Sequence, residues 1–264
     1  MHFTKAHAYG NDFLYVEAAA LGADPLAAVA RTLCDRHTGV GADGLIVFTR
    51  TGAGASMRLM NADGTAAEVS GNGIRGLAAI LLRDDDRREA QLTIETAAGP
   101  KRLTRIGRSQ SRQTFRAAMG LPRELREVPL EAAGEALEAV IMDFGNPQCV
   151  VLGTLPPSDR FQRLGPAIER HPMFRQGTNV EFAVVEAPGR VRILIWERGV
   201  GPTRSSGTGS CAALIAAASF GGAAREADIV APGGTQRVEW AEDSVYLTGW
   251  AEVVFDGEWL REFE

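Results

Sequence analysis

The sequence contains one pattern twice, and this repeat constrains the fold more than any other feature. Residues 70–73 (SGNG) and 206–209 (SGTG) each lead into an apolar stretch, and they lie 136 positions apart. Residues 9–12 (YGND) recur as 144–147 (FGNP), and residues 97–100 (AAGP) recur as 232–235 (PGGT), at an offset of 135. The repeat is longer than a solenoid unit. It therefore predicts two domains of one fold, each with a glycine-led helix start.

Each helix start offers a way to bind a small anion. The first backbone N–H groups of a helix have no partner within the helix, and the helix dipole places partial positive charge there. A serine with glycines before a helix is also an ordinary N-cap, and a single copy would indicate no more than that. Two copies at matching places in a repeat favour a ligand held by backbone N–H groups.

Composition limits the class of protein. At 264 residues, 45% of them hydrophobic and 23% charged, the chain suits two globular domains. The net charge of −5 argues against a nucleic-acid surface, which needs a clustered basic excess. The longest apolar run, residues 211–220, is too short to span a membrane, and the N-terminus lacks an apolar signal segment. We therefore expect a cytoplasmic protein without nucleic-acid or membrane partners.

The cysteines and the glycine motifs give no sign of a metal or an organic cofactor. Cys34, Cys149 and Cys211 are an odd count without metal-ligand spacing, so they indicate neither a disulfide framework nor a zinc site. No P-loop lysine follows either glycine motif, and no dinucleotide-binding glycine pattern follows a strand. We therefore expect no cofactor and no metal.

The chain as a whole predicts a strand-rich α+β protein with about one long helix per half. Short alternating apolar runs are separated by glycine-rich turns, and their hairpin-like spacing argues against parallel pairing. Residues 121–138, rich in proline, glutamate and alanine, are predicted to bridge the halves. We assign residues 1–118 to the first domain and residues 119–255 to the second, with 256–264 as a segment that can complete the first.

The motifs together resemble those of the diaminopimelate epimerases, cofactor-independent enzymes that invert one α-carbon of a bis-amino acid. The resemblance covers nearly the whole chain. Its motifs are residues 10–13 (GNDF), 39–44 (GVGADG), 61–64 (NADG), 70–73, 145–147 (GNP), 177–179 (GTN), 197–199 (ERG), 207–209 and 232–234 (PGG).

This resemblance implies a fold of two similar domains, each with strands wrapped round a central helix. It implies that one amino-acid substrate is held between the two helix N-termini. The implied reaction is the interconversion of LL- and meso-diaminopimelate in lysine and cell-wall precursor biosynthesis. The resemblance is also compatible with a homodimer.

The resemblance assigns residues to the substrate. Five polar side chains would hold its distal, unreacted end: Asn61, Asn146, Asn179, Glu197 and Arg198. Four backbone N–H groups would hold the reacting carboxylate and stabilise the enolate-like charge that builds on it: those of Gly71, Asn72, Gly207 and Thr208. Asn11 would lie beside the reacting centre.

The chain departs from the family at the two bases. Both are cysteines directly before the glycine motifs in the family, and Ser70 and Ser206 occupy those positions here. Ionising a thiol of pKa about 8.5 at pH 7 costs roughly 2 kcal/mol, whereas a hydroxyl resembling water, at about 15.7, costs roughly 12 kcal/mol. Gln148 and Pro202 replace a histidine and a glutamate that are common in the family. Ser70 and Ser206 remain the predicted catalytic residues.

Two alternatives stay open at this point. One is a catalytically silent amino-acid binder, either a native serine-bearing homologue or an engineered protein in which both cysteines were replaced. The other is an isomerase or tautomerase acting on a more acidic carbon, for which weaker bases suffice. Incorporation of solvent deuterium at the α-carbon would distinguish an enzyme from a binder.

Overall fold

The computed structural model describes residues 1–260, and residues 261–264, part of the segment predicted to complete the first domain, lie outside the described residues. The chain forms two compact units. Unit 1 is Met1–Ala117 together with the chain from Gly249 on, and unit 2 is Ala118–Thr248. Both units combine strands and helices, so the predicted α+β class with two similar domains is confirmed.

Unit 1 is built from long strands, one short strand and two α-helices. In chain order its elements are β1 (His2–Ala8), β2 (Asn11–Glu17), a 3-10 turn (Ala18–Ala20), α1 (Leu26–Cys34), β3 (Gly44–Thr51), β4 (Gly54–Asn61), β5 (Ala66–Ala67), α2 (Gly71–Leu81), β6 (Ala90–Thr96), β7 (Gly99–Ser109), β8 (Arg112–Gly120) and the later part of β17 (Val245–Glu258).

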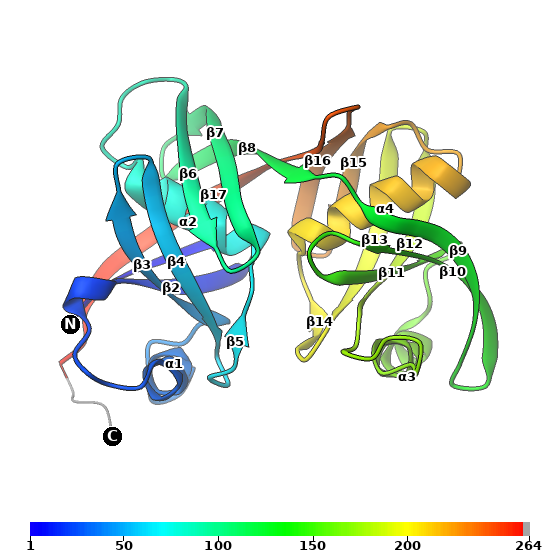
Figure 1. Ribbon diagram of the computed structural model, residues 1–264, viewed down its shortest axis with the longest axis horizontal. Coiled ribbons are helices and arrows are strands. Elements are labelled where there is room, and N and C mark those ends of the chain that lie inside the picture. The colour runs from blue at the N-terminus through cyan, green and yellow to red at the C-terminus, as the bar shows by residue number, and fades with distance from the viewer. Residues whose placement is uncertain (261–264) are drawn as a thin grey trace. The chain divides into compact units, whose positions relative to one another are not determined.

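The strands of unit 1 close on themselves around α2. The hydrogen-bonded order is β17, β1, β2, β3, β4, β6, β7 and β8, and β8 pairs again with β17. Figure 1 shows α2 enclosed by these strands. Residues 71–80 of the helix are all buried, including the polar Asn72 and Arg75, because strands surround the helix. The closed ring thus fixes the start of α2 at one end of the unit.

Unit 2 repeats this arrangement with its own elements. They are β9 (Arg123–Ala132), β10 (Glu135–Asp143), β11 (Pro147–Leu152), α3 (Ser158–Glu169), β12 (Asn179–Ala187), β13 (Arg190–Glu197), β14 (Gly201–Thr203), α4 (Gly207–Phe220), β15 (Glu226–Ala231), β16 (Gly234–Trp240) and the start of β17. The long strands pair in the order β9, β10, β11, β12, β13, β15, β16 and β17. The helix α4 packs against β11, β12, β13, β15 and β16, and residues 207–217 are buried.

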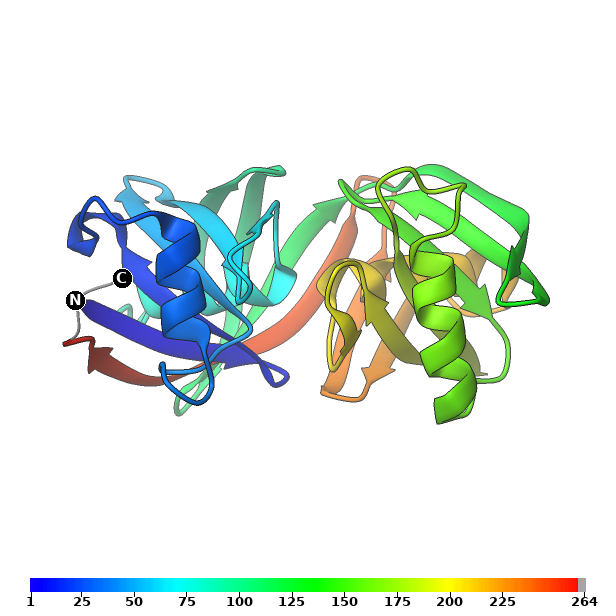
Figure 2. The same cartoon turned by 90° about the horizontal axis from the view of Figure 1, so that it is seen from below.

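A second helix in each unit covers the outer face of the strands, as Figure 2 shows for α1 and α3. In unit 1, Leu33 of α1 packs with Leu14 and Leu45, and in unit 2, Leu164 of α3 packs with Val180. Neighbouring strand residues point the other way, toward the central helix, because side chains alternate along a strand. The strands between the outer helix and the central helix are buried on both faces, which explains why their sequences are almost wholly apolar.

Two features of the sequence-based prediction are wrong. Pairing is not exclusively antiparallel, because β2–β3, β4–β6, β11–β12 and β13–β15 are parallel. Each parallel pair is joined through a helix, which supplies the long crossover that parallel strands need. Residues 121–138 are not a bridge, since β9 and β10 form a hairpin within unit 2 that turns at residues 133 and 134.

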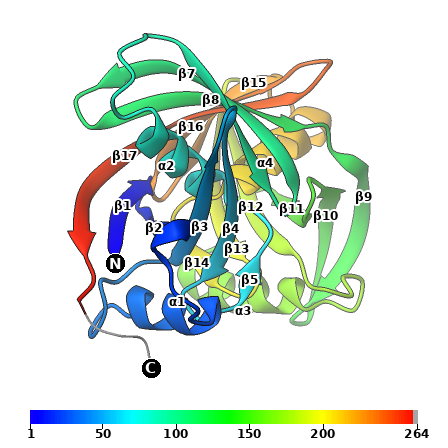
Figure 3. The ribbon, with the colours of Figure 1, turned by 60° about the vertical axis from the view of Figure 1, so that its left-hand side comes forward.

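The strand β17 passes from unit 2 into unit 1. Val245 pairs with Trp240 of β16, whereas His2 to His7 of β1 pair with residues 252–258. Figure 3 shows the later part of β17, in red, beside β1. Residues 249–255, predicted to lie in the second domain, belong to unit 1.

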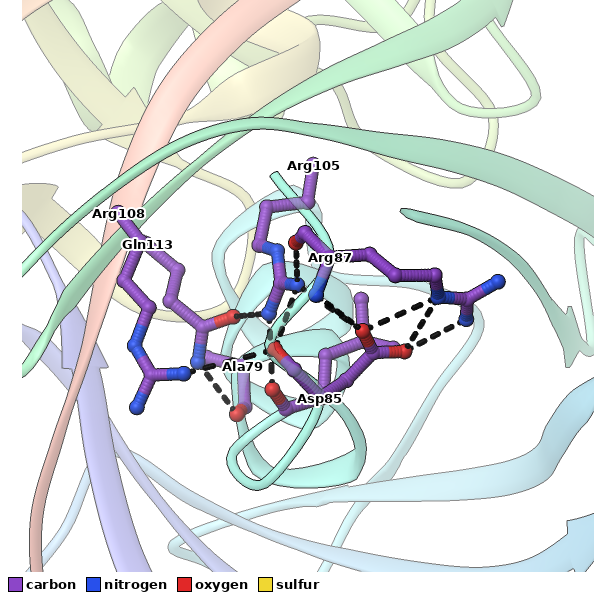
Figure 4. A network of polar contacts seen from close by, with 7 residues as sticks. Ala79, Asp85, Arg87, Arg105, Arg108 and Gln113 are labelled. Carbon is purple, nitrogen blue, oxygen red and sulfur yellow. Dashed lines mark hydrogen bonds and ion pairs between the residues drawn. The ribbon is translucent and has the colours of Figure 1, made fainter. Parts of the chain in front are cut away.

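A buried arginine closes the C-terminal end of α2. Arg105 is fully buried and donates to the carbonyl oxygens of Leu82 at 2.8 Å and Asp85 at 2.7 Å. It also donates to Oε1 of Gln113 at 3.0 Å, and Gln113 donates to the carbonyl of Ala79 at 2.8 Å (Figure 4). The last carbonyls of a helix lack partners within it, so this network satisfies them and complements the negative end of the helix dipole.

Across residues 1–260, none of the helices is both long enough and apolar enough to cross a membrane.

Candidate active site

Ser70 caps the N-terminus of α2. Its backbone is extended (φ −127°, ψ 122°), and its Oγ accepts a hydrogen bond from the N–H of Gly73 at 3.1 Å. This bond satisfies one of the free N–H groups of the first turn. A Cβ on residue 73 would stand 2.7 Å from Cδ1 of Ile46, so glycine there leaves room for the Ile46 side chain.

Ser206 caps α4 in the same way. Its backbone is extended (φ −132°, ψ 133°), and its Oγ accepts from the N–H of Gly209 at 3.1 Å. The backbone angles are close to those of Ser70, and the capping bond has the same length. The prediction of two glycine-led helix starts is therefore confirmed.

A chain of polar side chains supports the first turn of α2. Asn72 is buried and donates through Nδ2 to Oδ1 of Asn11 at 3.2 Å, while its own Oδ1 accepts from Nη2 of Arg75. The fully buried Arg75 guanidinium lies 5.6 Å from the centre of the Tyr9 ring, a cation–π arrangement. These contacts hold Asn11 beside the helix start and place a positive charge one turn inside it.

Carboxylates brace the turn that carries Asn11. Oδ2 of Asp43 accepts from Nδ2 of Asn11 and from the N–H of Asp12, both at 3.0 Å. Arg36 bridges Asp12 at 2.7 Å and Asp43 at 2.9 Å. Burial raises the pKa of Asp43, whereas hydrogen bonds from Arg36 and Lys5 outweigh burial at Asp12 and lower its pKa. The turn is therefore held rigidly by charged groups.

Asn61 lies in the neighbouring turn of unit 1. It ends β4 opposite Gly44 of β3, so its segment runs next to Asp43. Its Nδ2 donates to Oγ1 of Thr65 at 3.0 Å, and its N–H donates to the Thr65 carbonyl at 2.8 Å. These are turn-stabilising bonds, and they fix the orientation of the half-buried side chain.

A similar polar group supports the first turn of α4. Oγ1 of Thr208 accepts from Nε2 of Gln148 at 3.2 Å and from Nδ2 of Asn146 at 3.4 Å. Gln148 also donates to Oδ1 of Asn146 at 2.8 Å. Gln148 is fully buried, so its amide acts as a support between the turn after β10 and the helix.

The remaining residues predicted to bind substrate lie at the start of β12 and at the end of the neighbouring β13. Oδ1 of Asn179 accepts from the backbone N–H of Arg198 at 3.0 Å, and its Nδ2 donates to the carbonyl of Pro147 at 3.1 Å. Nη1 of Arg198 donates to the carbonyl of Gln176 at 3.2 Å. Glu197 is half-buried at the last position of the strand. Asn179 thus ties the Arg198 turn to the Asn146 turn.

The carbonyl side of the Ser206 cap is held by a buried glutamine. Nε2 of Gln236 donates to Oγ of Ser205 at 3.1 Å and to Oγ of Ser210 at 3.3 Å. Ser210 in turn donates through Oγ to the carbonyl of Ser206 at 2.7 Å. Because these groups are buried, the orientation of the cap is fixed from the helix side and from β16.

Within the described residues 1–260, no group of three or more His, Cys, Asp or Glu side chains is placed to hold a metal ion. Cys34, Cys149 and Cys211 are all buried. Burial raises the pKa of Cys34 to about 12 and also raises the pKa of Cys149, so neither thiol is a base near neutral pH.

Comparison with known proteins decides the family. The sequence profile described as "Diaminopimelate epimerase" matches residues 3–122 and 140–254, which is most of the chain. The chain belongs to the diaminopimelate epimerase family. It is therefore a member of an isomerase family.

Curated relatives of this family match over nearly their full length. The diaminopimelate epimerase of Desulforudis audaxviator is 42% identical over 99% of this chain and 100% of its own. The diaminopimelate epimerase of Pelotomaculum thermopropionicum is 39% identical over 98% and 99% of the two chains. A crystal structure of a hydroxyproline epimerase from Agrobacterium vitis shares the fold, with a TM-score of 0.71, 16% identity and coverage of 97% and 91%.

Several residues predicted to bind substrate are in contact within each unit. In unit 1, Asn11 and Asn72 are in contact beside the Ser70 cap. In unit 2, Asn146 and Thr208 are in contact one residue from Gly207, and Asn179 contacts Arg198. The backbone N–H groups predicted to hold a carboxylate belong to the first turns of α2 and α4.

Sequence reasoning missed three residues that shape these sites. Asp43 and Gln236 have no signal beyond their positions near glycine-rich turns. Glu181 has one: it is the single charged residue within the buried run 179–183 of β12. Acidic residues are rarely fully buried, so an acidic residue at an inward position of such a strand is a candidate functional residue.

Proposed function

We propose that the protein is a cofactor-independent amino-acid epimerase that interconverts LL- and meso-diaminopimelate, with Ser70 and Ser206 in the positions of the two bases. The observation that carries the proposal is the pair of serine-capped helix starts, alike in backbone and in capping bond, in a chain of this family. The proposal places the reaction in lysine and cell-wall precursor biosynthesis in the cytoplasm.

The helix starts supply the groups that this reaction needs for charge stabilisation. Removing the α-proton of an amino acid leaves an enolate-like negative charge on its carboxylate. Backbone N–H groups of a helix start can hold that carboxylate and favour the developing charge without a metal. The buried Arg75, one turn inside α2, adds a positive charge near one of the two helix starts.

The polar turns supply recognition of the unreacted end of the ligand. Asn146, Asn179 and Arg198 are oriented by hydrogen bonds to neighbouring segments, so little rotamer freedom is lost when a ligand binds. Arg198 offers a guanidinium for the distal carboxylate, which is a charge-assisted pair. This arrangement favours a bis-amino dicarboxylic acid over a simple amino acid.

Serine in place of cysteine predicts slow turnover. Each hydroxyl oxygen already accepts an N–H bond, which lowers its basicity, and the ionisation of a hydroxyl costs roughly 10 kcal/mol more than that of a thiol. Activity therefore requires a group that takes the hydroxyl proton.

Solvent exchange tests the proposal. Purified protein is incubated in D2O with LL- or meso-diaminopimelate, and deuterium at the α-carbon is followed by NMR. The proposal expects slow incorporation that survives exhaustive dialysis against a chelator. No incorporation above the rate without protein, or activity restored only by added metal, would contradict it.

A catalytically silent amino-acid binder is the second candidate, favoured by a specific observation. Both serine hydroxyls serve as helix caps, and a buried amide, Gln148, lies where family members commonly carry histidine. A binder would show calorimetric affinity for diaminopimelate and no exchange in the same samples.

A further inference from the structure

The strand β12 carries a glutamate into the interior of unit 2. Glu181 lies between Val180 and Phe182, whose side chains pack against α3, so by alternation its own side chain points toward α4. It is fully buried. Among the described residues, neither carboxylate oxygen has a hydrogen-bond partner. A buried polar group without a partner is costly to the folded state and calls for a functional reason.

The Glu181 carboxyl group borders the Ser206 cap. A Cβ placed on Gly209 would overlap Oε1 of Glu181 and would stand 3.0 Å from Oγ of Ser206. Both oxygens therefore border the same small space, which the glycine leaves open. They lie within reach of a direct hydrogen bond after a side-chain rotation, or of a single bridging water.

The hydroxyl of Ser206 has a proton to give. Its Oγ uses a lone pair to accept the N–H of Gly209, and a serine hydroxyl is both a donor and an acceptor. Glu181 is an acceptor when ionised and a donor when protonated. The Ser206 hydroxyl can therefore donate a hydrogen bond to an ionised Glu181, or accept one from a protonated Glu181, across the space beside Gly209.

The equivalent position in unit 1 is apolar. Ile46 of β3 corresponds to Glu181, because Gly44 and Asn179 begin the two strands and the contact with the helix glycine is the same. In unit 1, Cδ1 of Ile46 lies next to the position that a Cβ on Gly73 would take. In unit 2, Oε1 of Glu181 lies next to the position that a Cβ on Gly209 would take. Packing alone is therefore satisfied by an isoleucine, and the carboxyl group in unit 2 has another role.

The surroundings of Glu181 favour its protonated form. Burial, and next the negative charge of Glu197 on β13, raise its pKa well above the ordinary value of 4.5. The strand β11 contributes the Cys149 thiol, whose own pKa is raised. Residues 207–220 of α4 contain no charged side chain, and they contribute hydroxyls and the Cys211 thiol. A carboxyl group in such a site exchanges protons nearer to neutral pH than an exposed one.

We propose that Glu181 receives the hydroxyl proton of Ser206 when Ser206 removes the α-proton of the ligand, and that it returns this proton at the end of the cycle. This role rests on the proposed function. The Cα–H bond breaks, its proton bonds to Ser206 Oγ, the hydroxyl proton passes to the Glu181 carboxylate, and the electron pair remains on the ligand as the enolate. Glu181 acts through Ser206 and is a positioning and proton-accepting residue.

Two variants of Glu181 and one matched control test the role. Glu181→Gln keeps the shape but cannot accept a proton as a carboxylate, and Glu181→Ile copies unit 1. The control is Glu186→Gln, which changes an exposed carboxylate on the same strand. Deuterium incorporation at the α-carbon of diaminopimelate is measured across a range of pD, with ligand affinity measured by calorimetry on the same samples.

The expected result is a loss of exchange with binding retained. Both Glu181 variants should exchange at least tenfold more slowly than wild type, with dissociation constants within about threefold, and the control should match wild type. Wild-type exchange should rise with pH through a transition above the ordinary glutamate range, and Glu181→Gln should lose that transition.

The outcomes separate this inference from the proposed function. Absence of exchange in the wild-type protein would reject the proposed function and, with it, the role of Glu181. Exchange in wild type that is unchanged in rate and pH profile in folded, ligand-binding Glu181→Gln would reject the role of Glu181 alone. If Glu181→Gln does not fold, Glu181→Ile decides by the same criteria, since isoleucine already packs at this place in unit 1.

Discussion

The starts of α2 and α4 share a backbone and a capping serine, but the buried ionisable groups beside them differ. In unit 1 the group is Arg75 on the helix itself, and the facing strand supplies Ile46. In unit 2 the position matching Arg75 is Cys211, and the facing strand supplies Glu181. A cation beside a helix start favours a bound carboxylate, whereas a carboxyl group beside one can hold or release a proton.

This difference shows how one fold repeated in a chain can support two chemical tasks. The repeat keeps what the backbone needs: the capping serine, the glycine at the close approach and the apolar helix. Individual inward-facing positions can differ between the two units, because the backbone does not depend on the side chains at these positions. The predictions below test whether the two helix starts differ in function as they differ in composition.

The largest effect is expected from introducing thiols at both caps. Ser70→Cys combined with Ser206→Cys should raise epimerisation of diaminopimelate by several orders of magnitude, because ionising a thiol costs roughly 10 kcal/mol less than ionising a hydroxyl. Each single change should help much less, since inversion needs a base and an acid in one turnover. Epimerisation is followed by NMR or a coupled assay.

The single-cysteine variants sharpen the comparison of the two helix starts. If Glu181 assists Ser206, the variant that keeps Ser206 and carries Ser70→Cys should be the faster of the two. A double-cysteine protein that folds, binds ligand and remains as slow as wild type would remove the epimerase assignment.

The next effect concerns ligand recognition, which the proposal assigns mainly to unit 2. Arg198→Ala should weaken diaminopimelate binding by a few kcal/mol, because the distal carboxylate loses a charge-assisted partner. The position in unit 1 that matches Arg198 is Ala62, so unit 1 has no equivalent arginine at this position to bind the carboxylate. Calorimetry with diaminopimelate and alanine measures the effect, and equal affinities of the wild-type protein for the two ligands would contradict it.

A smaller effect is expected on stability from replacing the buried carboxyl group. Glu181→Ile should raise the free energy of unfolding by about 1–3 kcal/mol at neutral pH, since it removes a buried polar group without a partner. Urea denaturation measures the change. A destabilised variant would mean that Glu181 makes a favourable contact in the folded protein.

The same variant should show a defined pH dependence. Because the pKa of Glu181 is raised in the folded protein, the folded state binds the proton more tightly than the unfolded chain. Wild-type stability should therefore fall as pH rises from about 4.5 toward the raised pKa, and the advantage of Glu181→Ile should grow over that range. An advantage independent of pH would indicate a packing effect instead.

The smallest effects are expected from removing the caps. Ser70→Ala and Ser206→Ala should each lower the free energy of unfolding by about 1 kcal/mol, because each loses one N-cap hydrogen bond. Equal losses would support equivalent structural roles. A much larger loss at Ser206 would show that its hydroxyl makes a stabilising contact beyond the capping bond.

The sequence alone was sufficient to predict the repeat, the α+β class and the two capped helix starts. Each of these depends on local patterns: glycines where backbones approach closely, a serine before a helix, and apolar residues at regular spacing. The parallel pairs were not predictable in this way, because pairing direction depends on where each crossover helix packs. The hairpin of β9 and β10 was also missed, because its composition is that of an exposed segment.

The tertiary structure decided which side chains meet. Asp43 and Asn11 are far apart in the sequence but share a hydrogen bond, and Gln148 meets Thr208 across sixty positions. The sequence places Glu181 in an apolar strand, yet only the fold brings its carboxyl group beside Gly209 and the Ser206 cap. Local patterns determine which elements form, because they act through neighbouring residues. Contacts between elements depend on the register and packing of the closed sheet, which no single segment encodes.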